Sequence, residues 1–178
     1  KCLNANDNIK YLIREIKVMD SIRHPNIISI MSVCFTNIYV YIVMEYFKST
    51  TLSSYISKVS TTLDYGIKKN RNYFISSQIC KALAYLHNLT PSILHKDIKP
   101  ENILINEELV IKVCDLGLSK TSDLSPGLHT TVGHHFHGTP MYMPPEILID
   151  IQPGTTHSDI WSLACCIVEL FSERTVWE

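Results

Sequence analysis

The sequence lacks a charge imbalance of either sign. The 16 Lys and Arg residues oppose 17 Asp and Glu residues, so the formal net charge of the 178-residue chain is −1. Nucleic acids and anionic membranes attract chains with concentrated positive charge, and the sequence has no such concentration. It also lacks the apolar run of about 20 residues that a transmembrane helix needs. We therefore expect no nucleic-acid partner and no membrane segment in this chain.

Cysteine pairs with the C-x-x-C spacing are absent, although the chain holds six cysteines. They are Cys2, Cys34, Cys80, Cys114, Cys165 and Cys166. Most of them lie in apolar segments, where a free cysteine behaves as a small hydrophobic residue. Disulfide scaffolds belong mainly to small secreted chains. The cysteines therefore predict buried free thiols in a reducing compartment, and we expect the protein in the cytoplasm.

An initiating Met is missing as well, because residue 1 is Lys, and the chain stops at Glu178 within a patterned region. We expect from both ends that the sequence is a piece of a longer protein. Since 46% of the residues are hydrophobic, the chain can form the core of one domain or of most of one.

A small part with strands comes first in the chain. Apolar residues at helical spacing predict a helix over residues 7–22, and Pro25 marks its end because proline has no N–H to donate. Runs of β-branched and aromatic residues over 27–33 and 39–45 predict an antiparallel hairpin with a turn at Thr36-Asn37.

A larger, mainly helical part follows from about residue 48. The elements predicted in it are a short helix over 52–59, a long helix over 65–88, short strands over 103–105 and 110–114, and an apolar helix over 157–171. The apolar face of the long helix is expected to hold Phe74, Ile75, Ile79, Leu83 and Leu86. The last helix is apolar enough to be buried on most sides. Together these elements predict an α+β fold class.

A polar stretch over residues 95–102 lies between two apolar segments, which predicts a polar loop held on buried structure. Within it Asp97 and Lys99 place a carboxylate and a cation side by side, and Asn102 adds an amide oxygen that can bind a metal. Phosphoryl transfer needs a group that positions a hydroxyl, positive charge at the moving phosphoryl, and oxygen ligands for magnesium. The alternative for these residues is an ordinary polar turn.

Other segments stand in a fixed order around this loop. Residues 95–102 read H-K-D-I-K-P-E-N, residues 115–117 read D-L-G, residues 138–146 read G-T-P-M-Y-M-P-P-E, residues 158–163 read S-D-I-W-S-L, and Glu15 lies ten residues before Pro25. With Lys for Arg, Leu for Phe and Pro for Ala, the set resembles the H-R-D, D-F-G, A-P-E and D-x-W-S-L motifs of a eukaryotic-type protein kinase. Lys99 and Thr139 are similar to the Ser/Thr-directed pattern, and residues 84–92 resemble the tyrosine-kinase-like group of Ser/Thr kinases.

The resemblance covers essentially the whole chain and implies a bilobal protein-kinase-like fold. Residues 1–47 would form a partial N-lobe with the hinge, and residues 48–178 an incomplete, mainly helical C-lobe. A glycine-rich G-x-G-x-x-G segment is absent from the sequence, and the family's last helices would follow residue 178. We therefore expect a kinase domain that is truncated at both ends, in which Glu146 lacks its usual Arg partner.

The resemblance makes Asp97, Lys99 and Asn102 the catalytic residues. Asp97 would orient the substrate hydroxyl and accept its proton, and Lys99 would neutralise charge on the γ-phosphoryl group. Asn102 and Asp115 would hold Mg²⁺. Asp159 would bond the backbone of the catalytic loop, a role compatible with capping its own helix.

The resemblance also implies a set of ATP-binding residues. Met44 would be the gatekeeper, and Leu104 would lie under the adenine ring. Lys1 would pair with Glu15 and touch the α- and β-phosphates, although Lys1 can equally be an ordinary terminal lysine and Glu15 a solvated charge. The hinge contacts implied are Glu45, Tyr46 and Phe47. Cys114 either faces the nucleotide pocket or is a plain core cysteine.

Two expectations concern the segment after Asp115. Four histidines lie at positions 129, 134, 135 and 137, and no Cys or carboxylate completes a zinc-ligand set with them, so a His-rich activation segment is favoured over a metal site. Phosphorylation of that segment, if it is used, is expected on Thr130 or Thr131.

The function that follows is that of a protein Ser/Thr kinase, which uses ATP and Mg²⁺ to phosphorylate Ser or Thr residues of protein substrates. The alternative is an inactive pseudokinase or scaffolding fragment that binds partners. The missing segments favour the alternative, whereas the retention of Asp97, Lys99, Asn102 and Asp115 argues against it, because a scaffold has no need of all four.

Overall fold

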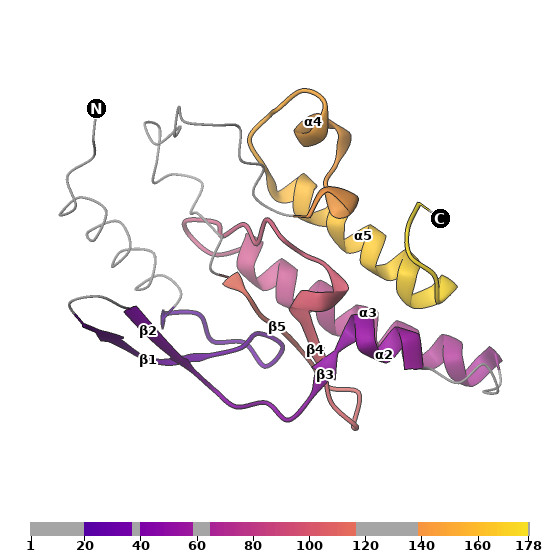
Figure 1. The fold of residues 1–178 in the computed structure, drawn as a ribbon, viewed down its shortest axis with the longest axis horizontal. Coiled ribbons are helices and arrows are strands. Elements are labelled where there is room, and N and C mark those ends of the chain that lie inside the picture. The colour runs from indigo at the N-terminus through magenta and orange to yellow at the C-terminus, as the bar shows by residue number, and fades with distance from the viewer. Residues whose placement is uncertain (1–19, 37–39, 59–64, 117–138, 178) are drawn as a thin grey trace.

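The computed structural model describes residues 20–36, 40–58, 65–116 and 139–177, and it has an α+β architecture, as predicted (Figure 1). The elements in chain order are β1 (Ile30–Phe35), β2 (Val40–Met44), β3 (Thr50–Thr51), α2 (Leu52–Lys58), α3 (Tyr65–His87), η1 (Pro100–Asn102), β4 (Ile103–Ile105), β5 (Ile111–Val113), η3 (Pro140–Tyr142), α4 (Pro145–Leu148) and α5 (Thr156–Ser172). The helix predicted over 7–22 lies outside the described residues, except for its last three positions.

The predicted N-terminal hairpin is confirmed as the antiparallel pair β1–β2, which runs from Phe35 opposite Val40 to Ile30 opposite Met44 with a register shift between Ser32 and Ile30. The first strand begins at Ile30 rather than at Ile27. The backbone before it bonds to a distant strand instead of to β2. Val113 of β5 accepts the N–H of Ile28 at 2.9 Å and donates its own N–H to the carbonyl of Asn26 at 2.8 Å. Asn26 and Ile28 therefore bond to the second sheet, while Ser29 bonds to Glu45 beyond the end of β2.

The second sheet has the order β3-β4-β5, with both pairs antiparallel. The strand predicted over 103–105 is confirmed, and the one predicted over 110–114 is shorter. Side chains alternate along β4 and β5, so Ile103, Ile105, Ile111 and Val113 are buried while Leu104 and Lys112 are half-buried. The two alternate residues lie opposite each other in the β4–β5 register. The proposed boundary at residue 47 falls in the link between the two sheets and stays a prediction.

The core lies between α3, the second sheet and α5 (Figure 1). Ile75, Ile79, Leu83 and Leu86 are each at most 1% exposed, which confirms the predicted apolar face of α3 at those positions. The prediction is wrong for Phe74, because its side chain is 51% exposed. It precedes Ile75 by one residue, and one residue turns the side chain by about 100° around a helix. Its apolar character alone therefore assigned it to the wrong face.

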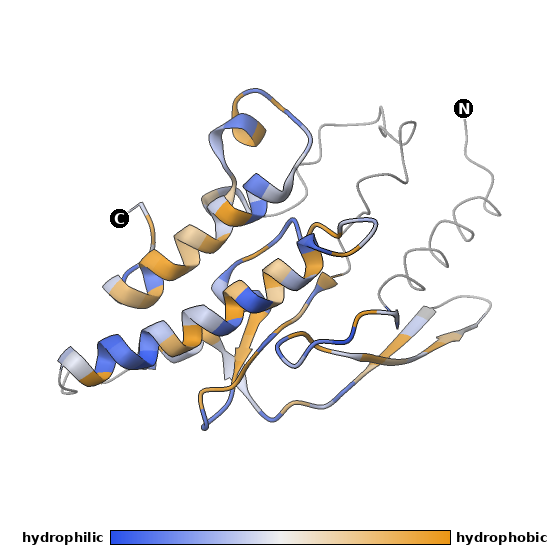
Figure 2. Ribbon diagram, turned by 180° about the vertical axis from the view of Figure 1, so that it is seen from behind, coloured by the Kyte–Doolittle hydropathy of each residue, from blue (hydrophilic) through white to orange (hydrophobic). Residues whose placement is uncertain are grey.

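Helix α5 is apolar along most of its length (Figure 2). Leu163, Cys166 and Leu170 are buried, but apolar side chains on other faces are exposed. The exposed set is Ile160, Trp161, Val168 and Phe171. The prediction that this helix is buried on most sides is therefore wrong for the described structure. Among the described elements α5 packs mainly against α3 and η3, and these cover one stripe of it.

The five described cysteines are free, as predicted. Cys165 and Cys166 are buried and Cys114 is half-buried, but Cys34 and Cys80 are exposed, so the prediction of burial is wrong for these two. A helical residue or strand residue next to apolar neighbours can still face solvent, because neighbours in sequence point to different faces. The reducing, cytoplasmic compartment stays a prediction. Within the described ranges, no helix combines the length and the apolar character needed to cross a membrane.

Candidate active site

His95 opens the polar loop and is fully buried. Its ring Nε2 lies 3.0 Å from the carbonyl oxygen of Cys114, and its Nδ1 accepts the N–H of Asp97 at 3.3 Å. A neutral ring that carries its proton on Nε2 satisfies both bonds. Burial lowers the pKa of His95, although Asp159 and the Cys114 carbonyl act in the opposite direction. His95 is therefore an uncharged link between the loop and the end of β5.

Asp159 holds the backbone of the same loop from the first turn of α5. Its carboxylate accepts the N–H of His95 at 2.9 Å and the N–H of Lys96 at 2.8 Å. A ring nitrogen of His87, at the end of α3, lies 2.9 Å from the same carboxylate. This confirms the predicted bonds from Asp159 to the loop backbone. The helix is capped separately, by reciprocal bonds between Thr155 and Ser158.

The Asp97 carboxylate accepts four hydrogen bonds, so that both of its oxygens are held. Its Oδ1 accepts the N–H of Thr139 at 3.0 Å and the hydroxyl of Thr139 at 3.1 Å. Its Oδ2 accepts the side-chain amide of Asn102 at 2.9 Å and pairs with the Lys99 ammonium at 2.9 Å. Lys99 also donates to the Thr139 hydroxyl at 2.6 Å. The structure thus brings the three predicted catalytic residues into direct contact, and adds Thr139 to them.

These contacts set the charge of Asp97, whose side chain is 10% exposed. Burial alone would raise the pKa of this carboxyl and is the largest single influence on it. Lys99, Thr139 and Asn102 favour the ionised form, and together they lower the pKa of Asp97 below its usual value. Asp97 is therefore a carboxylate at neutral pH, which is the form that can accept a proton.

The end of β5 is fixed beside the loop by Cys114. Its N–H donates to the carbonyl of Asn102 at 2.9 Å, and its Sγ lies 3.3 Å from the same oxygen. Burial, with a further contribution from Asp115, raises the pKa of the Cys114 thiol to about 11. Its partial exposure does not fit a plain core cysteine, and whether it faces the nucleotide stays a prediction. It is a half-buried, protonated thiol bonded to the loop.

Asn102 and Asp115 each offer an oxygen ligand, and Cys114, the residue before Asp115, donates its N–H to the carbonyl of Asn102. The amide nitrogen of Asn102 donates to the carbonyl and to the carboxylate of Asp97, at 2.8 and 2.9 Å, which leaves its amide oxygen with no donor among the described residues. Asp115 is exposed, has φ 67°, and receives no hydrogen bond from the described part of the chain at its carboxylate. Within that part no cluster of three or more His, Cys, Asp or Glu side chains is suited to a metal. One carboxylate and one amide oxygen fit Mg²⁺, which keeps several waters and takes further oxygens from phosphates.

The link from β2 to β3 holds the predicted hinge residues. Glu45 Oε1 accepts the N–H of Ser29 and the Lys112 ammonium, each at 2.8 Å. Burial opposes ionisation, but Lys112 and Ser29 prevail and lower the pKa of Glu45. Lys112 also lies 5.8 Å from the ring centre of Phe47. The Glu45 side chain thus anchors the predicted hinge to β5, and its backbone N–H donates to the carbonyl of Ser29 at 3.0 Å.

The other predicted nucleotide contacts differ in how exposed their side chains are. Met44 ends β2 and is exposed, and Tyr46 is 90% exposed. Leu104 is half-buried on the sheet face opposite to Ile103 and Ile105. Lys1 and Glu15 lie outside the described residues, as do Thr130, Thr131 and the four histidines of the segment after Asp115.

Sequence reasoning missed two partners at this site, His87 and Lys112. Lys112 had a local signal, since it is the one polar residue between the apolar Ile111 and Val113 of a strand and so must face the other side of the sheet. His87 had none of this kind, because its partner Asp159 is 72 positions away.

Comparison with known proteins supplies an independent observation. The family model described as "Protein kinase domain" matches residues 1–178. Serine/threonine kinase NLK of Caenorhabditis elegans is 34% identical over 176 residues, which cover 95% of this chain and 26% of that protein. Human 3-phosphoinositide-dependent protein kinase 1 is 32% identical over 164 residues, covering 92% and 28%. CBL-interacting serine/threonine-protein kinase 12 of Arabidopsis thaliana is 36% identical over 165 residues, covering 92% and 31%. The chain thus spans less than a third of the length of each of these relatives.

Proposed function

Because the chain belongs to the protein kinase family, and curated relatives similar to it carry the names of Ser/Thr kinases, we propose that it transfers the γ-phosphoryl group of ATP to Ser or Thr hydroxyls of protein substrates. The observation that carries the proposal is the set of contacts at Asp97. Its ionised carboxylate is held by Lys99, Asn102 and Thr139, in the arrangement that positions a hydroxyl for phosphoryl transfer.

Asp97 acts on the substrate hydroxyl. A carboxylate whose pKa is lowered is a weak base, so its main work is to orient the hydroxyl and to take the proton late. This suits phosphoryl transfer, since a loose transition state demands positioning more than early proton removal. The substrate hydroxyl then replaces one of the present donors to Asp97. The Thr139 hydroxyl is the donor we expect to be replaced, because the N–H of Thr139 also donates to the same oxygen, Oδ1.

Lys99 brings positive charge to the site where the negatively charged γ-phosphoryl group is transferred. Its ammonium lies 2.9 Å from Asp97 and 2.6 Å from the Thr139 hydroxyl, so it is held by both sides of the site before substrate arrives. A cation held in advance stabilises the transition state without the cost of reorganisation.

Magnesium-bound ATP supplies the transferable phosphoryl group, and the metal neutralises part of its charge. Asn102, through its amide oxygen, and Asp115, through its carboxylate, would hold the metal. Leu104, Met44 and the link with Glu45 and Phe47 would hold the adenine. Lys1 and Glu15 complete this set as predictions from the sequence.

The proposal is tested by incubating the full chain with labelled ATP, Mg²⁺ and a mixed protein substrate, followed by phosphoamino-acid analysis. We expect label on Ser or Thr, and none when a chelator replaces Mg²⁺. In parallel, ATP should raise the melting temperature of the chain more with Mg²⁺ than without it. A chain that transfers no label and whose melting temperature does not respond to ATP contradicts the proposal, and supports the inactive scaffold instead.

A further inference from the structure

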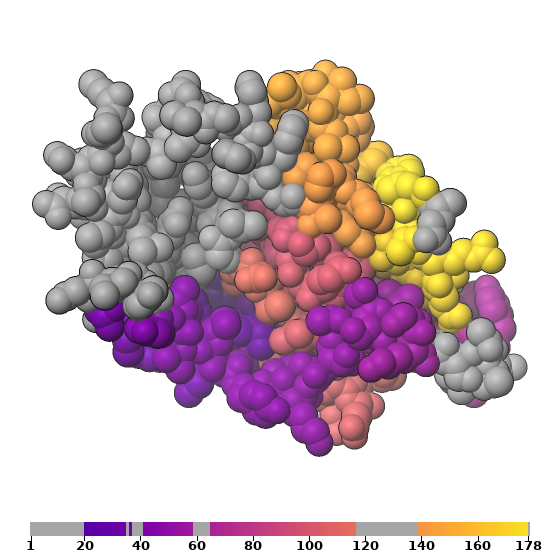
Figure 3. Space-filling model, viewed as in Figure 1, coloured from indigo at the N-terminus to yellow at the C-terminus, as the bar shows by residue number. Residues whose placement is uncertain are grey.

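Residues 23–28 form a joint between the N-terminal hairpin and the helical part of the chain. The side-chain amide of Asn26, which is buried, donates to the Gln78 side chain and to the carbonyl of Ile111, each at 3.0 Å. The carbonyl of Asn26 accepts the N–H of Val113 at 2.8 Å. In Figure 1 this indigo segment reaches from the hairpin toward β5, and on the face shown in Figure 3 the purple atoms of the N-terminal part lie next to pink atoms of the β4–β5 region. The joint therefore fixes the two parts to each other.

His24 closes the joint through one nitrogen of its ring. Its Nδ1 accepts the backbone N–H of Asn26 at 3.1 Å. A backbone N–H can only donate, so Nδ1 must carry a lone pair, and the ring is neutral with its proton on Nε2. A protonated ring carries a proton on both nitrogens and cannot accept this bond. We propose that His24 is a pH switch in the joint, which is closed while the ring is neutral and loosens when the ring is protonated.

Tyr85 of α3 holds the His24 ring where this bond needs it. The two rings are stacked, with their centroids 5.1 Å apart and their planes at 30°. The Tyr85 hydroxyl accepts the backbone N–H of Arg23 at 3.1 Å, so α3 contacts two successive residues of the joint. An aromatic face attracts a cation, and this contact taken alone would favour protonation of His24. The bond from Asn26 opposes it, because only the neutral ring can make that bond.

Positive charges on two other elements act against a charged His24. Burial lowers the pKa of His24 most, followed by Lys112 of β5 and Lys81 of α3. On the segment of His24 itself, Arg23 pairs with Asp20 at 3.8 Å, and both side chains are exposed. A protonated ring would therefore add one more positive charge near those of Lys112 and Lys81.

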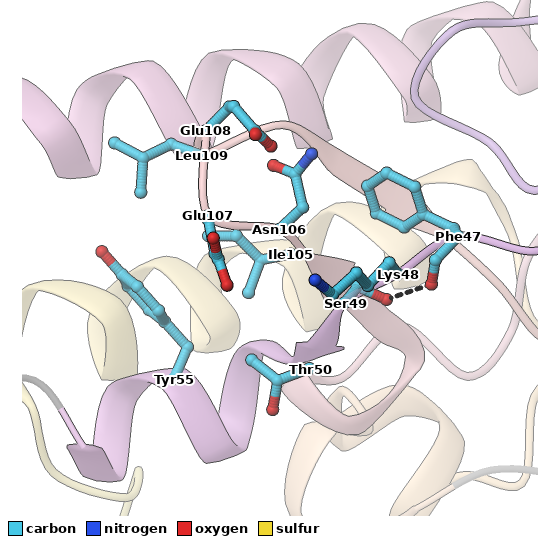
Figure 4. A pocket seen from close by; sticks show the side chains of 10 residues that line it. All are labelled: Phe47, Lys48, Ser49, Thr50, Tyr55, Ile105, Asn106, Glu107, Glu108 and Leu109. Carbon is cyan, nitrogen blue, oxygen red and sulfur yellow. Dashed lines mark hydrogen bonds between the residues drawn. The ribbon is translucent and has the colours of Figure 1, made fainter.

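The position of Lys112 is fixed from the hinge side. Its ammonium lies 2.8 Å from Glu45 Oε1 and 5.8 Å from the ring centre of Phe47. Figure 4 shows the Phe47 ring at one end of a pocket of about 640 Å³ beside the hinge exit. Glu45 offsets part of the Lys112 charge, and the pKa of His24 is lowered all the same. Since Lys112 is held by these contacts, its charge stays close to the joint when the pH falls.

Acid is the condition that loosens the joint. In an open joint His24 has an ordinary pKa near 6.5, and in the closed joint its pKa is lower. The contribution of the neutral ring is fully present above about pH 6.5, and it is lost as the pH falls from there through the pKa of the closed joint. Opening takes up one proton, so the opening equilibrium changes by at most about tenfold per pH unit.

The titration of His24 tests the switch directly, by NMR on the full chain between about pH 5 and 8. The ring C2–H resonance is assigned by its loss in a variant at position 24. We expect its midpoint to lie at a lower pH in the folded chain than in the chain unfolded in urea. The amide resonance of Asn26 should shift with the same midpoint. A folded midpoint equal to or above the unfolded one overturns the proposal, and so does an Asn26 amide that does not respond.

Two variants separate the acceptor from the charge. In His24→Asn the side-chain oxygen takes the place of Nδ1, because asparagine readily accepts the backbone N–H two residues ahead, and it does not titrate. In His24→Phe the stack on Tyr85 is kept and the acceptor is lost. At about pH 7.5, urea denaturation should give wild type and His24→Asn unfolding constants within about twofold of each other, and His24→Phe a constant several-fold larger.

At low pH the wild type should lose its likeness to His24→Asn. At about pH 5.5 the unfolding constant of the wild type should rise several-fold relative to that of His24→Asn, and approach that of His24→Phe. The comparison with variants removes the contribution of the other histidines, which all three chains share. The same pH dependence in wild type and His24→Asn overturns the proposal.

This inference goes beyond the proposed function and does not depend on it, because both measurements report on the fold. A chain that transfers no phosphoryl group, yet shows the lowered midpoint of His24, keeps the switch and loses the kinase proposal. An active kinase in which His24 titrates as in the unfolded chain keeps the kinase proposal and loses the switch.

Discussion

The carboxylate of Asp159 accepts the backbone N–H of His95 at 2.9 Å, and so joins the first turn of α5 to the loop that holds Asp97. It also accepts the N–H of Lys96, whose φ of 67° is a left-handed conformation that lysine seldom adopts. The loop therefore keeps its shape through a buried acceptor on another element, rather than through the preference of its own residues.

Replacing Asp159 by alanine should weaken the fold strongly. Asp159→Ala leaves the buried N–H of His95 and the part-buried N–H of Lys96 without their acceptor, and the loss of a buried acceptor costs about 1–3 kcal/mol. We expect the free energy of unfolding to fall by about 3 kcal/mol in urea denaturation. Asp150→Ala, at an exposed site, is the control and should change it by less than about 0.5 kcal/mol. Equal effects of the two substitutions would remove Asp159 from this role.

Gln78 should be the second polar residue on which stability depends. Its amide accepts the N–H of Ile111 and the side chain of Asn26, and donates to the carbonyl of Leu109. Gln78→Met keeps the shape of the side chain but leaves these groups unsatisfied, so we expect a loss of about 2–4 kcal/mol in the free energy of unfolding. Lys81→Met on the exposed side of the same helix serves as the control. A Gln78→Met variant as stable as the control contradicts this account of the buried amide.

Cysteine labelling should distinguish Cys114 from Cys34. The pKa of Cys114 is raised to about 11, so almost none of the thiol is ionised to thiolate at pH 8. The residue is also half-buried. Cys34 is exposed. Because the thiolate is the nucleophile, brief treatment with iodoacetamide at pH 8 should modify Cys34 at least about tenfold faster than Cys114. Peptide mapping by mass spectrometry measures both rates, and the unfolded chain should label the two equally. Fast labelling of Cys114 in the folded chain would contradict its placement against Asn102.

The lowered pKa of Asp97 should appear in the pH dependence of stability. An unfolded Asp titrates near pH 4, and the folded carboxyl titrates at a lower pH because Lys99, Thr139 and Asn102 favour its ionised form. Its contribution is therefore fully present above about pH 4, and is lost as the pH falls through the folded pKa. Urea denaturation of wild type and Asp97→Asn should show a stability difference that is constant at higher pH and shifts against the wild type below about pH 4. A difference that does not change with pH contradicts the paired carboxylate.

Local patterns predicted the elements whose residues act through near neighbours. The strand Ile103–Ile105 and most of α3 follow from alternation and from helical spacing, which depend on a few adjacent positions. The proposed catalytic set could be named from the sequence because Asp97, Lys99 and Asn102 stand close together in one short segment. The start of β1 was misplaced because it depends on Val113, a residue far along the chain.

The remaining errors share this cause. Neither the pair Asn26–Gln78 nor the pair Glu45–Lys112 has a local signature, since their members are 52 and 67 positions apart. Burial of a whole helix surface is set by what packs on it, so the apolar composition of α5 did not reveal that Trp161 and Val168 are exposed. Sequence pattern named the groups that are proposed to do chemistry, and the structure showed the packing that holds them.

The most direct test of the account is the rate of phosphoryl transfer by Asp97→Asn. The full-length protein, the variant and an Asp150→Asn control are compared with labelled ATP and Mg²⁺, after thermal unfolding and Mg²⁺-dependent ATP binding have shown that all three fold and bind nucleotide. Loss of the proton acceptor and of its pairing with Lys99 should lower kcat at least about 100-fold in Asp97→Asn and leave the control unchanged. An Asp97→Asn variant that transfers phosphate at the wild-type rate would contradict the central role of this carboxylate.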